Sequence, residues 1–126
     1  MRRIRVIGMA GLLALLAGHA TEAANPGKLD TTADLLAFCE GSGDAGDPTG
    51  ADLAFCNGFI AGTGLFYLEL VRADAIKPLA CKEPTPPLNE IRSAFVRWAK
   101  ANPQQLSAKP VDGFWQAMAA TYPCSR

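Results

Sequence analysis

Histidine is nearly absent from this 126-residue chain, whose only copy is His19. It lies in an N-terminal segment with the features of a secretory signal peptide, so the exported chain is expected to contain none. Without histidine, the mature protein has no Ser-His-Asp or Cys-His catalytic unit and no histidine metal site. An enzyme would have to use carboxylates, lysine, tyrosine or a free thiol. We therefore expect a protein that is not an enzyme and holds no metal or cofactor.

An excess of charge of either sign is also missing. The chain has 12 lysines and arginines and 12 aspartates and glutamates. Removing residues 1–23 takes away three basic side chains and one acidic side chain, which leaves a net charge of −2. Such a surface offers no general attraction to nucleic acid or to anionic lipid.

Residues 1–23 are predicted to form a secretory signal peptide. Three arginines open the segment, an apolar run covers residues 6–18, and the small residues that follow allow cleavage after Ala20 or Ala23. The apolar run is too short to span a bilayer comfortably. The mature chain, residues 24–126, is expected to be periplasmic or secreted, and its length suits a single domain.

Four cysteines remain in the mature chain, and they are Cys39, Cys56, Cys81 and Cys124. An even number in a small exported domain indicates two disulfides, and the wide spacing argues against zinc. Cys39 is expected at the end of one helix and Cys56 about two turns into the next. A short turn between antiparallel helices could join these two, which would leave Cys81 to pair with Cys124. This pairing is preferred, and the other two pairings remain open.

The spacing of apolar and capping residues predicts four helices and no strand. Thr31 is a good N-cap with Asp34 as a capping-box partner, and Thr49 with Asp52 repeats the pattern. Pro110 favours the start of the last helix. The expected helices run over residues 32–40, from the second cap to residue 71, over 88–101, and from 110 to 122. The predicted fold class is all-α: a small four-helix domain with a central apolar helix and two disulfides.

The second helix is predicted to be the buried rod of this core. Residues 53–68 carry no charge, but they are fewer than the roughly 18–20 that a membrane span needs. Gly58, Gly62 and Gly64 suggest close approach by another backbone, and Ala54, Gly58 and Gly62 are expected to form a groove of small residues at four-residue spacing. Gly58→Leu is therefore expected to overpack the core, at a cost of about 1–3 kcal/mol.

The third and fourth helices each show one apolar face at spacings of three and four residues. In the third helix this predicted core face consists of Leu88, Ile91, Ala94, Phe95 and Trp98. In the fourth helix it consists of Val111, Phe114, Trp115, Met118 and Tyr122.

Carboxylates supply the remaining candidates for chemistry. Asp44, Asp47 and Asp52 have a spacing that invites a calcium hypothesis, but the alternating ligands and closing glutamate of an EF-hand loop are missing. Glu40 and Asp44 are the candidates for an enzyme that uses carboxylates, and a solvated loop is the preferred interpretation. A redox enzyme is disfavoured because the chain has no Cys-X-X-Cys motif.

Five features in a fixed order carry a family resemblance. They are DLLAFC at 34–39, CNGFIAG at 56–62, Cys81 in a proline-rich loop, NEIRSAFVRWAKANPQQL at 89–106 and AATYPC at 119–124. Together they resemble the Rap/Tai family, small exported proteins named for immunity to type VI secretion amidase effectors. Two departures stand out. Lys82 follows Cys81 where the family commonly has proline, and Trp98 stands where an aliphatic residue is frequent.

The resemblance implies that residues 24–126 form a helical, disulfide-linked immunity domain. It further implies that the protein binds a peptidoglycan amidase in the periplasm and blocks its active site, often as a homodimer. An alternative of a different class is an envelope-stress or chaperone-like helical protein without a toxin partner. The apolar second helix favours this alternative if the domain exposes it.

Overall fold

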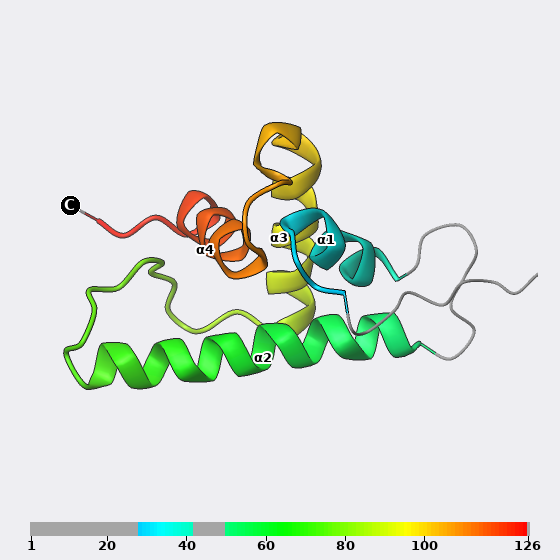
Figure 1. The fold of residues 1–126 in the computed structure, drawn as a ribbon. Helices are drawn as coiled ribbons and strands as arrows, with labels where there is room; N and C mark the ends of the chain where they lie inside the picture. Colours follow the sequence, from blue (N-terminus) through cyan, green and yellow to red (C-terminus); the bar gives the residue numbers. More distant parts are fainter. Residues whose placement is uncertain (1–27, 42–49, 126) are drawn as a thin grey trace, which may run out of the picture.

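The computed structural model describes residues 28–41 and 50–125. Within them the regular structure is entirely helical (Figure 1). The elements are α1 (Thr32–Glu40), α2 (Ala51–Arg72), α3 (Leu88–Ala101), the 3₁₀ turn η2 (Pro103–Gln105) and α4 (Pro110–Thr121). The four cysteines lie in two disulfides. The prediction of an all-α domain with four helices and two disulfides is therefore confirmed. The predicted signal peptide and the residues Asp44, Asp47 and Thr49 lie outside the described part of the chain.

The boundaries of α1 follow from its capping residues, as predicted. The Thr31 hydroxyl accepts a hydrogen bond from the backbone N–H of Asp34 at 3.2 Å, and the Asp34 carboxylate accepts one from the backbone N–H of Thr31 at 2.9 Å. This reciprocal pair satisfies two N–H groups that a helix start leaves free. Gly41 ends the helix in the left-handed region, with φ 75°, where glycine is favoured.

Asp34→Asn is expected to reduce stability at neutral pH and to lose this effect in acid. The hydrogen bond from the Thr31 side chain lowers the pKa of Asp34 below its ordinary value, so its contribution is present above the unfolded pKa. That contribution disappears as the pH falls through the lower folded pKa. Urea unfolding of both proteins at about pH 7 and about pH 2.5 measures the difference. A difference that does not change with pH would contradict this role for the carboxylate.

α2 is the longest helix, and the other three helices lie on one side of it (Figure 1). Its N-cap is Gly50, with φ 70° and no side-chain cap, rather than the predicted Thr49. Asp52, Cys56 and Ile60 form its buried face.

The core is a single cluster drawn from all four helices. Its buried apolar members are Leu35, Phe38, Cys39, Cys56, Ile60, Ala94, Phe95, Ala99, Phe114, Ala117 and Met118. Phe114 stands between the other elements, with ring centroids 6.1 Å from Phe95 of α3 and 6.0 Å from Phe59 of α2. The core prediction is wrong for two residues, because Leu88 is 36% exposed and Val111 is 46% exposed. Each lies in the first turn of its helix, before the chain reaches the packed interior.

The start of α1 docks on the segment that precedes α4. The backbone N–H groups of Thr32 and Ala33 donate to the carbonyls of Ala108 and Leu106 at 2.8 and 3.0 Å, and the Thr32 hydroxyl bonds to the Ala108 carbonyl at 3.0 Å. Thr32 is fully buried here. Gly113 makes this approach feasible, because a Cβ at that position would lie 2.1 Å from the Thr32 hydroxyl oxygen.

The glycines of α2 are not in a buried groove, and that prediction is wrong. A Cβ added at Gly58, Gly62 or Gly64 would meet no heavy atom within 4 Å. The physical reason is that α2 is apolar on nearly every side, so its sequence does not indicate which side faces the core. Gly58→Leu is accordingly no longer expected to overpack the interior of the domain.

Candidate functional site

The side of α2 that faces away from the other helices carries an apolar stripe. We call it the outer stripe, and it consists of Ala54, Gly58, Ala61, Leu65 and Leu68. These positions follow one another at spacings of four and three residues, so they share one side of the helix. Leu65 is 66% exposed and Leu68 51% exposed, and the neighbouring Phe66 is 66% exposed. Large apolar side chains gathered in one exposed helical turn are typical of an interaction surface.

By length and composition alone, α2 is also the one described helix that could cross a membrane. The core helix of a water-soluble domain passes the same test when it is mostly buried, but only 11% of the apolar window of α2 is buried, so the prediction of a buried rod is wrong. Cys56 and Ile60 are buried against the other helices, and Cys56 is bonded to Cys39 of α1. These contacts fit a helix that belongs to the packed domain.

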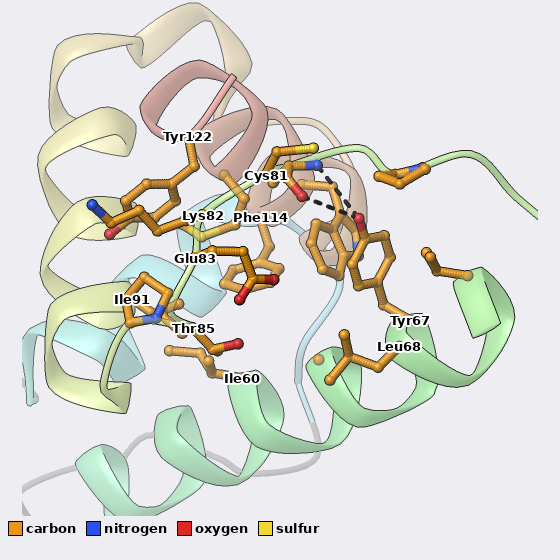
Figure 2. Close-up of a pocket in the computed structure, with 17 residues that line it drawn as sticks. Ile60, Tyr67, Leu68, Cys81, Lys82, Glu83, Thr85, Ile91, Phe114 and Tyr122 are labelled. Carbon is orange, nitrogen blue, oxygen red and sulfur yellow. Dashed lines mark hydrogen bonds between the residues drawn. The ribbon is translucent and has the colours of Figure 1, made fainter. Parts of the chain in front are cut away.

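A pocket of about 450 Å³ lies beside the C-terminal half of α2 (Figure 2). The segment 78–86 forms one wall, and α2, α3 and α4 form the others. The apolar lining includes Ile60, Leu68, Val71, Ile91, Phe114 and Met118. Gly64 also lines it, and the open space over its Cα widens the pocket. The volume is within the range of pockets that bind small ligands or single side chains.

Tyr67 of α2 fastens the segment 78–86 over this pocket. Its hydroxyl accepts a hydrogen bond from the Leu79 N–H at 2.9 Å and donates one to the Ala80 carbonyl at 3.3 Å. The ring lies against Trp115 of α4, with centroids 4.2 Å apart. Tyr67 therefore holds one wall of the pocket from beneath, so the pocket exists before any ligand enters.

The C-terminus fastens the same segment from the other side. Cys81 and Cys124 form a disulfide with a Cα–Cα distance of 4.7 Å, and the Cys81 N–H donates to the Tyr122 carbonyl at 2.8 Å. The other disulfide joins Cys39 and Cys56 inside the core. On chain-entropy grounds the shorter loop is worth about 3 kcal/mol and the longer about 4 kcal/mol.

Partial reduction is expected to open Cys81–Cys124 before Cys39–Cys56. Cys81 is exposed, whereas Cys39 and Cys56 are buried and a reductant reaches them only when the domain opens. Stepwise reduction followed by alkylation and peptide mapping should label Cys81 and Cys124 first, with the helical circular dichroism retained. Mapping without a reductant tests the pairing itself. Labelling of all four cysteines at one rate would contradict the expected order.

The charged groups at the pocket differ in their contacts. Tyr122 donates a hydrogen bond from its hydroxyl to Glu90 at 3.1 Å, and burial together with this carboxylate raises the pKa of Tyr122. Neither Lys82 nor Glu83 has a hydrogen bond or ion pair within the described residues. Figure 2 shows Glu83 pointing toward the middle of the lining residues, whereas Lys82 extends toward Tyr122. One carboxylate therefore stands at the mouth of an apolar pocket.

Of the carboxylates considered from the sequence, the structure describes Glu40 and Asp52. Glu40 forms an ion pair with Lys100, and Asp52 is buried on the core side of α2. Asp44 and Asp47 lie outside the described residues. Across residues 28–41 and 50–125, no group of three potential metal ligands comes together. The sequence does not single out Glu83, Tyr67 or Phe66, because Glu83 lies in a loop without periodicity and the other two lie in a helix that is apolar on nearly every side.

These features define a small helical domain cross-linked by two disulfides, with an exposed apolar helix face and a preformed pocket. The chain matches the family model of the Rap1a immunity proteins over residues 31–124. It belongs to this family, in agreement with the resemblance found in its sequence motifs. Comparison with curated proteins and with solved structures gave no match. Family membership makes it an immunity-type protein whose partner is a secreted toxin effector, and the disulfides fit a protein outside the cytoplasm.

Proposed function

We propose that this protein is exported to the periplasm, binds a peptidoglycan amidase delivered by type VI secretion and blocks its active site. The observation that carries the proposal is the family match over residues 31–124. The motifs DLLAFC and CNGFIAG and the AATYPC ending carry the resemblance to the Rap/Tai family, which is named for immunity to amidase effectors. Residues 1–23 are proposed to direct export and to be removed on the way.

The structure supports binding rather than catalysis as the activity. An inhibitor needs no catalytic group, only a surface that is already in its bound shape. The Cys81–Cys124 disulfide and the hydrogen bonds of Tyr67 hold the segment 78–86 in place before binding. Less conformational entropy is then lost when a partner docks.

Coexpression with the amidase effector of the same cell tests this proposal. The full chain is expected to form a complex with the effector and to restore growth when the effector is directed to the periplasm. A variant that lacks residues 2–23 serves as the matched control, because it should bind the effector in vitro without protecting the cell. Failure of the full chain both to bind and to protect would overturn the proposal.

A homodimer is proposed to form through the outer stripe. In an antiparallel pair of α2 helices centred on Ala61, Leu65 of one copy faces Gly58 of the other, and Leu68 faces Ala54. Large side chains would thus meet small ones on both sides of the central pair of Ala61 residues, which is the self-complementarity that a two-fold interface needs. In this register Glu69 and Arg72 lie opposite Leu53 and Gly50, so no like charges face each other.

Gly58→Leu tests this dimer. In a single copy the new Cβ would meet no heavy atom within 4 Å, but in the antiparallel pair the leucine side chain would collide with Leu65 of the partner copy. Light scattering should therefore give a dimer for the native protein and a folded monomer for Gly58→Leu. Val111→Leu, on an exposed position of α4, should leave the dimer intact. A native protein that is monomeric at high concentration would rule the interface out.

The exposed outer stripe also supports the alternative of a chaperone-like protein. Such a protein would bind unfolded chains through Leu65, Phe66 and Leu68 without a specific toxin. Suppression of the aggregation of a denatured client protein distinguishes the two functions. Protection of the client, combined with no binding to any amidase effector, would favour the alternative.

A further inference from the structure

We propose that the pocket beneath the segment 78–86 receives an arginine or lysine side chain of the effector, with Glu83 as the counter-ion of its charged head. This inference rests on the proposed function, because it names the chemical group by which the effector is recognised. Of the outer stripe, Leu68 alone also lines this pocket, and Glu83 lies outside the stripe.

The walls of the pocket suit the stem of such a side chain. Ile60, Leu68 and Val71 of α2 and Met118 of α4 line it with aliphatic groups. Lysine and arginine carry three or four methylene groups that pack on apolar surfaces while the charged head stays near water. A pocket of about 450 Å³ accommodates one such side chain, and the fixed segment 78–86 keeps it open.

The negative charge of Glu83 at the mouth of the pocket favours a positively charged ligand. Glu83 is exposed, has no partner among the described residues and points toward the middle of the lining residues (Figure 2). An anionic ligand would be repelled by this carboxylate. An uncharged apolar ligand would remove water from the carboxylate without replacing its hydrogen bonds, which costs free energy. A guanidinium or ammonium group supplies both the opposite charge and the hydrogen-bond donors.

Lys82 does not cancel this preference. It follows Cys81 at the position where the family commonly has proline, and Figure 2 shows its side chain extending toward Tyr122. There the acceptor Glu90 is already bonded to the Tyr122 hydroxyl. The ammonium of Lys82 thus lies on the Tyr122 side of the pocket, and the middle of the pocket is left to Glu83.

Gly64 provides a variant that blocks the pocket and spares the fold. A Cβ at this position would meet no heavy atom within 4 Å, so Gly64→Leu should fill the space from the α2 wall at little cost to the fold. Gly62 is the matched control. It lies on the same helix and is equally open, but it does not line the pocket.

The test is an NMR titration of the full mature protein with Nα-acetylarginine methylamide, and with pentanoate and pentanol as the anionic and neutral probes. The arginine probe is expected to shift the Trp115 indole and Glu83 signals. Glu83→Gln and Gly64→Leu should each weaken its binding by about tenfold or more, whereas Gly62→Leu and Lys82→Gln should not weaken it. Equal binding of pentanol, or unchanged binding to Glu83→Gln, would overturn the inference.

A second measurement separates this inference from the proposed function. Effector affinity is compared for the native protein, Glu83→Gln and Gly62→Leu. A loss of about tenfold or more in Glu83→Gln alone supports both proposals. Effector binding that is equal in all three would leave the immunity function standing and remove the role of the pocket. If the arginine probe binds but the effector does not, the pocket is a cation site, and the arginine or lysine side chain that it receives does not come from the effector.

Discussion

Gly113→Ala is expected to destabilise the domain by about 1–3 kcal/mol or more, although it adds a single methyl group. The new Cβ would stand 2.1 Å from the Thr32 hydroxyl oxygen and 2.8 Å from the Thr32 Cβ. No change of rotamer moves the Cβ of Thr32, because this atom is bonded directly to the backbone. The clash can therefore be relieved only if α1 moves away from α4. The hydrogen bonds from Thr32 to the Ala108 carbonyl would be lost with that movement.

Gly62→Ala is the matched control for this prediction, since both glycines lie inside helices and Gly62 is not part of the outer stripe. At Gly62 the added methyl group meets no neighbour, so the higher helix propensity of alanine should stabilise the protein by up to about 1 kcal/mol. Urea unfolding with the disulfides intact measures both changes. Similar effects of the two substitutions would show that α1 does not approach α4 as closely as described.

Phe95→Ala is expected to cost about 3–5 kcal/mol, the largest loss among the core positions considered. Phe95 is fully buried and its ring faces that of Phe114, through which α3 and α4 are joined. Domains of this size are typically stable by only about 5–15 kcal/mol, so the variant should be marginally folded at room temperature.

Val111→Ala provides the comparison for Phe95→Ala, because Val111 was predicted to be core but is 46% exposed. Its effect on the free energy of unfolding should stay within about 0.5 kcal/mol. Denaturant unfolding followed by circular dichroism measures the loss of stability in both variants. A small loss for Phe95→Ala, or a large one for Val111→Ala, would mean that the packed faces of α3 and α4 are assigned incorrectly.

Local signals in the sequence predicted the helix boundaries well. Thr31 and Asp34 begin α1 because their side chains accept hydrogen bonds from free backbone N–H groups, and Gly41 ends it because its own N–H bonds to a carbonyl of the last turn. Pro110 opens α4 because proline has no N–H that would need a partner there. These interactions span only a few residues. They are therefore visible in the sequence without any knowledge of the fold.

The buried side of α2 and the pocket could not be predicted in the same way. A helix that is apolar all round has no periodic signal to orient it, and for this reason the prediction of a buried groove at Ala54, Gly58 and Gly62 is wrong. Tyr67 bonds to backbone groups 12 and 13 residues further along the chain, and Glu83 lies in a proline-rich segment without periodicity. Both acquire their roles only when the segment 78–86 folds back over α2.

The docking of α1 on the segment before α4 ties the completion of folding to the end of the chain. The free N–H groups of Thr32 and Ala33 find their acceptors more than 70 residues later, and Cys81 needs a partner at position 124. A chain that crosses the inner membrane as an extended polymer, led by its N-terminus, would carry α1 across long before these partners arrive. The domain would then reach its native state only after nearly its whole length had been delivered, which keeps the chain unfolded during transport.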